Sequence, residues 1–190
     1  MSERNQSFSM VRDSFDDVPQ HELPAGYQLR PYRDGDDATW ISLQRAAEPF
    51  IQITDTLFES EYGTQRHELS DRMWFVETES NEPVASITAW FENEPPTPQD
   101  LGRIHWVFVH PDHQRRGISK AMMTAAMQRL ARSHSGAILG TSSGRPWAVK
   151  VYLDFGFHPL ATQRKEPEVL AAWRYVQSLL HHPALEKWLS

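Results

Sequence analysis

The stretch from Trp106 to Ser119, Trp-Val-Phe-Val-His-Pro-Asp-His-Gln-Arg-Arg-Gly-Ile-Ser, is the most informative part of this chain. Its apolar beginning predicts a strand, and the residues from Ser119 onward predict a helix that follows almost at once. The start of a helix carries unpaired backbone N–H groups and a partial positive charge, so it can bind a pyrophosphate. Gly117 allows close approach of the main chain, while Arg115 and Arg116 add positive charge. The same order of elements also occurs where nothing binds, with surface arginines that only keep a loop solvated.

A known family motif matches these residues. Val109-x-Pro111 followed by Gln114-x-x-Gly117-x-Ser119 resembles the acetyl-CoA motif of the GNAT superfamily of acyl-CoA N-acyltransferases. The usual motif reads Gln or Arg, two variable residues, Gly, one variable residue, and then Gly or Ala. Ser119 in the last position is therefore a mild departure from the pattern.

A second stretch lies at the expected distance downstream. Residues 139–143 resemble the next strand of the family, and residues 146–157 resemble the helix after it, which ends in Tyr, three residues, and Gly-Phe. The family often carries Asn three residues before the helix alanine, and that position holds Arg145 here. Two motifs in the correct order extend the resemblance over about residues 27–161.

The resemblance implies an α+β fold, a three-layer α/β/α sandwich with a mixed, mostly antiparallel central sheet flanked by helices. It implies an acetyl-CoA-dependent N-acetyltransferase, a transferase of the acyltransferase class, with acetyl-CoA as the donor substrate. The acceptor would be a primary amine of a small molecule or peptide that attacks the thioester directly. The residues expected at the cofactor are Phe108, Val109, Gln114, Arg115, Arg116, Gly117, Ile118, Ser119, Lys120 and Arg145.

Transfer of an acetyl group to an amine needs a stabilised carbonyl oxygen, a proton for the departing thiolate and a neutral amine. In the family a backbone N–H holds the carbonyl where the central strand splays from its neighbour, and by resemblance that group lies at or beside Val109. Tyr152 stands at the position of the family's tyrosine and is the expected acid. The alternative is a buried tyrosine that only packs.

The general base is harder to assign. The residues that strand alternation places on one face are Arg103, His105, Val107 and Val109. Of these, His105 matches a position that holds histidine in some amine acetyltransferases of the superfamily, and imidazole titrates near neutral pH. One alternative is a core histidine without a catalytic role. Another is that the amine loses its proton to water rather than to a side chain. Weaker rivals lie on the preceding acidic loop: Glu92, Glu94 and Asp100. Position alone suggests four residues for the acceptor pocket: Glu48, Phe50, Phe58 and Tyr62.

The composition limits the function classes. A chain of 190 residues with 39% hydrophobic side chains can bury one core. It has no cysteine, which excludes disulfides, thiolate metal sites and covalent cysteine chemistry. A formal net charge of −6 disfavours nucleic acid as a main partner.

The chain has no apolar run of the ~18 to 20 residues that a membrane span needs, and no secretion signal is recognised at its start. We therefore expect a cytoplasmic protein without a membrane partner. The histidines match no ligand spacing, so no metal site is expected.

The pattern of residues also predicts how the chain is organised. Residues 1–24 are polar without a sustained period, so we expect a flexible N-terminal arm. Residues 25–190 are expected to form a single domain with a C-terminal helical extension from about residue 166. Strands are expected at 27–32, 73–78, 84–91, 103–109, 136–141 and 157–161, and helices near 40–50, 57–69, 119–132, 146–156 and 167–180.

Two other functions and several arrangements stay open at this point. A catalytically silent CoA-binding module that acts through a protein partner would keep the same loop. An unrelated nucleotide-phosphate binder is disfavoured, because the chain has no Gly-x-x-x-x-Gly-Lys-Ser/Thr pattern. The C-terminal helix could pack on its own domain, cover the site as a lid or form a homodimer contact.

Overall fold

The computed structural model describes residues 5–93 and 100–190. The chain divides into two compact units: unit 1 comprises Met1–Pro19, Phe91–Arg103 and Ser133–Ser190, and unit 2 comprises Gln20–Trp90 and Ile104–Arg132. Among the described residues, seven strands form a sheet in the order β2-β3-β4-β5-β6-β1-β7. Strand β1 pairs antiparallel with β6 and β7, and β3 pairs antiparallel with β2 and β4. Strands β5 and β6 pair in parallel, so the sheet is mixed as expected.

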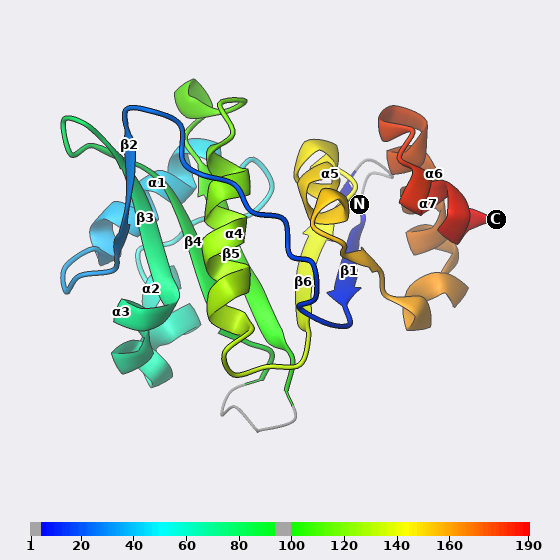
Figure 1. The fold of residues 1–190 in the computed structure, drawn as a ribbon, viewed down its shortest axis with the longest axis horizontal. Coiled ribbons are helices and arrows are strands. Elements are labelled where there is room, and N and C mark those ends of the chain that lie inside the picture. Colours follow the sequence, from blue (N-terminus) through cyan, green and yellow to red (C-terminus); the bar gives the residue numbers. More distant parts are fainter. Residues whose placement is uncertain (1–4, 94–99) are drawn as a thin grey trace. The chain divides into compact units, whose positions relative to one another are not determined.

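Unit 2 contains the loop on which the sequence interpretation depends. Its elements are β2 (Tyr27–Pro31), α1 (Asp37–Ala47), α2 (Leu57–Tyr62), the 3₁₀ helix η2 (Gly63–Glu68), α3 (Leu69–Arg72), β3 (Met73–Thr78), β4 (Pro83–Phe91), β5 (Gly102–Val109), the 3₁₀ helix η3 (Pro111–His113) and α4 (Ile118–Leu130). The last residue of β4 and the first two of β5 belong to unit 1. Helix α4 covers one face of these strands, and α1 and α2 lie on the other (Figure 1). Because both faces are covered, β4 is buried along nearly its whole length.

Aromatic side chains fill the space between α1, α2 and the sheet in unit 2. Trp40 of α1 packs edge-to-face on Tyr62 of α2 and on Trp106 of β5, with ring centroids 5.7 and 5.3 Å apart. Tyr62 packs in the same way on Trp90 of β4 at 5.1 Å. Edge-to-face pairs of this kind stabilise a packing beyond the burial of their area. This cluster therefore fixes the two helices against the strand that leads into the loop.

Unit 1 contains the second motif, residues 139–157, on β6 and α5. Its elements are β1 (Ser7–Arg12), β6 (Ala137–Ser142), α5 (Pro146–Asp154), β7 (His158–Pro159), the 3₁₀ helix η4 (Ala161–Lys165), α6 (Pro167–Leu180) and α7 (Pro183–Leu189). Pro146 begins α5 at a position where its missing N–H costs nothing. Helix α6 has the expected bounds, and its Trp173 packs on Phe8 of β1 with ring centroids 3.9 Å apart. The C-terminal helix thus packs within its own unit.

The beginning of the chain differs from the flexible arm expected for residues 1–24. Ser7–Arg12 forms strand β1, which pairs with β6 over six residues and with β7 over two. Phe8 and Met10 point into the core, with 2% and 0% of their surface exposed. In the sequence, two apolar side chains at a spacing of two are too short a pattern to predict a strand. The strand that stabilises β1 lies about 130 residues later in the sequence. The single domain expected for residues 25–190 stays a prediction.

The expected fold class is confirmed: a mixed, seven-stranded sheet flanked by helices, with an extra helix after the second motif. The strand expected at 157–161 is reduced to the two residues of β7, and α7 was not expected. Within residues 5–93 and 100–190, every helix is too short or too polar to cross a bilayer.

Candidate cofactor and catalytic site

The loop between β5 and α4 has two residues in the left-handed backbone region. Arg115 has φ 61° and Gly117, the N-cap of α4, has φ 89°. A Cβ added at Gly117 would meet no atom within 4 Å, so the requirement for glycine is conformational rather than steric. The same open space leaves the main chain accessible there.

The amides that follow this turn are the strongest candidates for an anion site. Helix geometry leaves the N–H groups of Gly117, Ile118 and Ser119 without an acceptor inside α4. The Lys120 N–H donates to Gly117 O at 3.1 Å, so it is already used. The Ile118 side chain is buried, 1% exposed, and anchors the start of the helix. With the partial positive charge of a 13-residue helix, this arrangement fits a pyrophosphate.

Two side chains of the loop hold the main chain in this shape. Gln114 Nε2 donates to the carbonyl of Val109 at 3.1 Å, and Arg116 Nη2 donates to the carbonyl of Asp112 at 2.9 Å. Tyr27, the first residue of β2, contacts the loop through its hydroxyl group. Its hydroxyl accepts from Arg116 Nη1 at 3.0 Å and lies 2.8 Å from His113 Nδ1. Arg116 therefore orders the loop as well as adding charge, and Arg115 and Lys120 supply the remaining charge.

The strand before the loop is interrupted at Trp106. This residue has φ 47°, a conformation that non-glycine residues rarely adopt within a strand. The strict alternation expected for Arg103, His105, Val107 and Val109 is therefore wrong at this point, because His105 and its neighbour Trp106 contact the same side chain. Local backbone strain of this kind costs about 1–3 kcal/mol and is concentrated at functional sites.

The shared contact is Glu61 of α2. Its Oε2 lies 2.8 Å from His105 Nε2 and 2.9 Å from Trp106 Nε1. The His105 and Glu61 side chains are 12% and 28% exposed, so the pair is partly shielded from water. Sequence reasoning missed Glu61, because the register of a short helix against a strand depends on tertiary packing. Phe108, expected at the cofactor, is buried with 5% exposed, whereas Val109 is partly exposed.

Tyr152 and Arg145 belong to unit 1. Tyr152 lies on α5 with 8% of its surface exposed, and burial raises the pKa of its phenol to about 12, partly offset by Arg145. The phenol is therefore protonated at neutral pH. Arg145 is the N-cap of α5, and its Nη1 donates to Ser142 Oγ at 2.7 Å. The arginine at this departure from the family motif thus ties the helix start to the end of β6.

The other end of α5 is held by a residue that sequence reasoning did not single out. Buried Arg12 of β1 donates to the carbonyls of Phe155 and Asp16, and to that of Ser14 at 2.7 Å. A Cβ at Gly156, which has φ 78°, would collide with this guanidinium. Strand β1 therefore explains why a glycine follows the helix that carries Tyr152.

The expected acceptor-side residues differ in their burial and contacts. Glu48 Oε1 accepts from the amides of Phe50 and Ile51 at 2.8 and 3.1 Å, which shapes the loop after α1. Phe58 and Tyr62 are buried in the aromatic cluster, 2% and 0% exposed.

The acidic loop residues are also engaged. In unit 1, Glu92 Oε2 accepts from the Leu101 amide at 3.1 Å, and Asp100 Oδ1 accepts from Asn93 Nδ2 at 2.9 Å. Glu94 lies outside the described residues.

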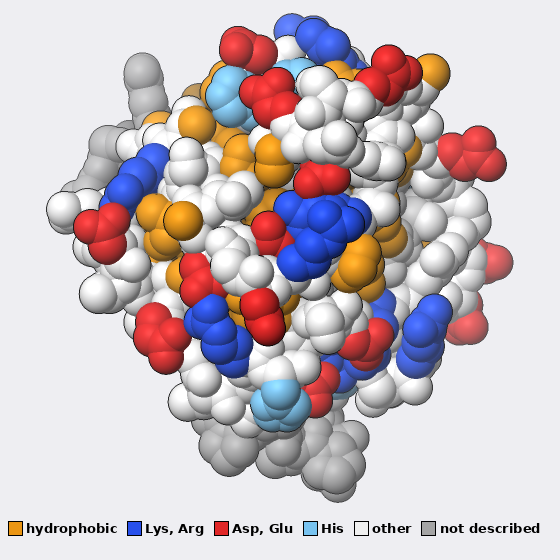
Figure 2. All heavy atoms as spheres, turned by 90° about the vertical axis from the view of Figure 1, so that its left-hand side faces the viewer, with side chains coloured by type: hydrophobic (Ala, Val, Ile, Leu, Met, Phe, Trp, Pro, Cys, Tyr) orange, Lys and Arg blue, Asp and Glu red, His pale blue; other side chains and the backbone are white. Residues whose placement is uncertain are grey.

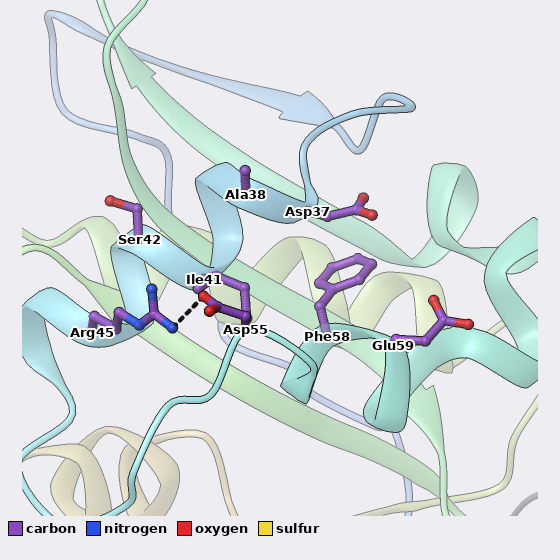
Figure 3. A pocket seen from close by; sticks show the side chains of 8 residues that line it. All are labelled: Asp37, Ala38, Ile41, Ser42, Arg45, Asp55, Phe58 and Glu59. Carbon is purple, nitrogen blue, oxygen red and sulfur yellow. Dashed lines mark hydrogen bonds and ion pairs between the residues drawn. The ribbon is translucent and has the colours of Figure 1, made fainter.

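A groove of about 480 Å³ lies between α1 and α2. Its lining residues are Asp37, Ala38, Ile41, Ser42, Arg45, Asp55, Phe58 and Glu59. Figure 3 shows Arg45 facing Asp55, to which its Nη2 is bonded at 2.7 Å. On the side of the molecule where α2, α3 and β2 lie, acidic and basic side chains are interspersed (Figure 2). Neither the loop amides nor His105 line this groove, so we do not assign the chemistry to it.

Comparison with known proteins agrees with these features. A family model described as "Acetyltransferase (GNAT) family" matches residues 37–157. The chain is 25% identical over 145 residues to mycothiol acetyltransferase of Streptomyces coelicolor, an alignment that covers 74% of this chain and 46% of that protein. The chain thus spans about half the length of this curated relative.

Solved structures share the fold. A GCN5-related N-acetyltransferase from Sphaerobacter thermophilus has a TM-score of 0.64 and 20% identity, covering 82% of this chain and 49% of that one. The diaminobutyrate acetyltransferase EctA from Paenibacillus lautus, in complex with L-2,4-diaminobutyric acid and coenzyme A, has a TM-score of 0.53 and 19% identity. That alignment covers 68% of this chain and 74% of that one. At these identities the structural likeness concerns the fold alone.

Proposed function

Because the chain belongs to the acetyltransferase (GNAT) family, we propose that it transfers an acetyl group from acetyl-CoA to a primary amine of a small molecule or peptide. The observation that carries the proposal is the left-handed turn at Arg115 and Gly117, which presents the first amides of α4 at an open surface. A chain without cysteine favours direct attack over a cysteine-bound acyl intermediate.

The pyrophosphate of acetyl-CoA would lie on the amides of Gly117, Ile118 and Ser119. Arg115 and Lys120 would add charge, and Gln114 and Arg116 would hold the loop in its binding shape. The thioester would lie along β5, where the backbone N–H of Val109 is the candidate donor to the carbonyl oxygen. The next amide, that of His110, already donates to Val84 O at 2.7 Å. We assign Phe108 to packing behind this strand and Arg145 to the start of α5.

The reaction needs two proton transfers. His105 is the proposed base that takes a proton from the attacking amine, because it is partly exposed on the strand that would hold the thioester. The amine nitrogen bonds to the carbonyl carbon, and the carbon–sulfur bond then breaks. Tyr152 is the proposed acid, since its phenol is protonated at neutral pH and could give its proton to the departing thiolate.

The activity is tested by release of the CoA thiol from acetyl-CoA in the presence of amines. The panel contains L-2,4-diaminobutyric acid, the acceptor named for one structural neighbour, together with polyamines, amino sugars and a peptide with a free amine. Turnover of at least one amine supports the proposal. Tight binding of acetyl-CoA without turnover of any amine would favour the silent CoA-binding module instead.

The cofactor loop has a matched control within unit 2. Gly117 and Gly35 both have positive φ, 89° and 96°, and a Cβ at either meets no atom within 4 Å. Gly117→Glu and Gly35→Glu therefore introduce the same charge and a similar strain. Only Gly117→Glu should abolish the rise in melting temperature that acetyl-CoA produces, because its carboxylate would repel the pyrophosphate. Full binding by Gly117→Glu would refute the assignment of the loop.

A further inference from the structure

One carboxylate oxygen in unit 2 contacts two consecutive residues of β5. Glu61 Oε2 lies 2.8 Å from His105 Nε2 and 2.9 Å from the indole nitrogen of Trp106. An indole N–H is only a donor and a carboxylate only an acceptor, so Trp106 donates to Glu61. This arrangement joins α2 to the strand at the residue with φ 47°.

The same reasoning sets the tautomer of His105. Because an ionised carboxylate cannot donate, the nitrogen that faces it must carry the proton. That nitrogen is Nε2, so in the neutral ring Nδ1 holds the lone pair. Nδ1 is then the atom of His105 that can take a proton from an amine. A ring with the opposite tautomer would place its N–H where a base needs a lone pair.

Glu61 also holds the irregular strand in place. Trp106 is fixed between the carboxylate at its nitrogen and the edge-to-face contact with Trp40 at 5.3 Å. The ring of Tyr62 packs on the His105 ring, with centroids 5.9 Å apart. The side chain of His105 is thus restrained by a hydrogen bond at one nitrogen and by a ring against one side.

We infer that Glu61 is a positioning residue that fixes the tautomer of His105 and the backbone conformation at Trp106 so that Nδ1 can accept the proton of the acceptor amine. The inference rests on the proposed function, in which His105 is the base. After proton transfer the imidazolium would lie beside the Glu61 carboxylate, which stabilises the charged ring.

Two titratable residues of α2, Glu61 and Tyr62, contact the His105 ring. The neighbouring strand β4 contributes none, since residues 83–91 contain no titratable side chain. The closest charged residue along β5 itself is Arg103, two positions earlier. Glu61 Oε2 lies 2.8 Å from the ring, so the charge of Glu61 should influence the titration of His105.

The first test is nitrogen NMR of His105, which does not depend on activity. In the wild-type protein, the neutral ring should carry its proton on Nε2. Glu61→Gln keeps a carbonyl oxygen that can accept, so the tautomer should be retained, whereas Glu61→Ala should lose the preference. A wild-type ring protonated on Nδ1 would overturn the inference.

The second test is the pH dependence of kcat/KM with the amine that is turned over fastest. Glu61→Gln removes the charge that favours the imidazolium, so the acidic limb of the profile should move down by about 1 pH unit. Glu61→Ala should lower kcat at least about ten-fold. Trp106→Phe keeps the pair between Glu61 and His105, so its acidic limb should stay in place. Glu59→Gln, on the same helix, removes an exposed carboxylate paired with Arg66 and serves as the matched control.

Failure of the inference can be distinguished from failure of the proposed function. A wild-type protein that turns over no amine contradicts the function, and with it the role of Glu61. An active wild-type protein whose Glu61→Gln and Glu61→Ala profiles match that of Glu59→Gln overturns the role of Glu61 alone. Circular dichroism of the folded Glu61→Gln protein ensures that the comparison is made between native states.

Discussion

Removal of one hydroxyl group, in Tyr27→Phe, should weaken acetyl-CoA binding without slowing the chemistry. The Tyr27 hydroxyl makes two hydrogen bonds to the loop, with Arg116 at 3.0 Å and with His113 at 2.8 Å. Phenylalanine keeps the edge-to-face contact with the His113 ring, whose centroid is 5.8 Å away. The variant therefore removes the two bonds and little else.

The size of the effect follows from the exposure of the loop. A hydrogen bond contributes about 0.5–1.5 kcal/mol, and water can replace part of each bond because Arg116 is exposed. We expect a loss of about 1–2 kcal/mol in the free energy that orders the loop. At about 1.4 kcal/mol for each factor of ten, the dissociation constant of acetyl-CoA should rise about 5- to 30-fold.

Isothermal titration calorimetry with acetyl-CoA measures this change directly. The KM for acetyl-CoA should rise with the dissociation constant, while kcat should stay within about two-fold of the wild-type value. Tyr175→Phe removes the hydroxyl of a tyrosine that is 39% exposed on α6 and serves as the control. Unchanged affinity in Tyr27→Phe would refute the idea that the ordered loop conformation is needed for binding.

Two further predictions concern unit 1. Tyr152→Phe should lower kcat at least about ten-fold with unchanged affinity for acetyl-CoA. In the wild-type protein kcat should show no loss near pH 10, because a phenol with a pKa of about 12 loses its proton only as the pH rises through that value. Equal kcat in stopped assays of both proteins would remove Tyr152 from the mechanism. Arg12→Met should lower the free energy of unfolding by about 2–4 kcal/mol in urea denaturation, because the carbonyls of Phe155 and Asp16 lose their donor. The exposed Arg33→Met should change it by less than about 0.5 kcal/mol, and equal effects of the two substitutions would contradict this role of Arg12.

Strong local patterns made much of the fold predictable. The runs 73–78 and 84–91 are rich in β-branched and aromatic residues, and 167–180 has a regular helical period, so their types and bounds could be read closely. The turn at Gly117 and the start of α4 were predictable because glycine and the first turn of a helix act locally, while cofactor binding there stays a prediction. Strand β1 was not, because its six residues are stabilised by a partner far away in sequence.

The surroundings of His105, the proposed base, could be seen only in the tertiary structure. Alternation assumes a regular strand, and the conformation of Trp106 breaks that assumption without any signal in the sequence, since tryptophan is typical of regular strands. Glu61 lies on a six-residue helix, whose register against β5 is set by the packing of Trp40 and Tyr62. For the same reason, Tyr27 could be predicted to lie in a strand but not to contact the loop.

A crystal structure with bound CoA tests the central claim most directly. The account predicts pyrophosphate oxygens within hydrogen-bond distance of the amides of Gly117, Ile118 and Ser119, with Arg115 and Gly117 still at positive φ. CoA bound elsewhere on the chain, or no CoA bound at saturating concentration, would contradict it.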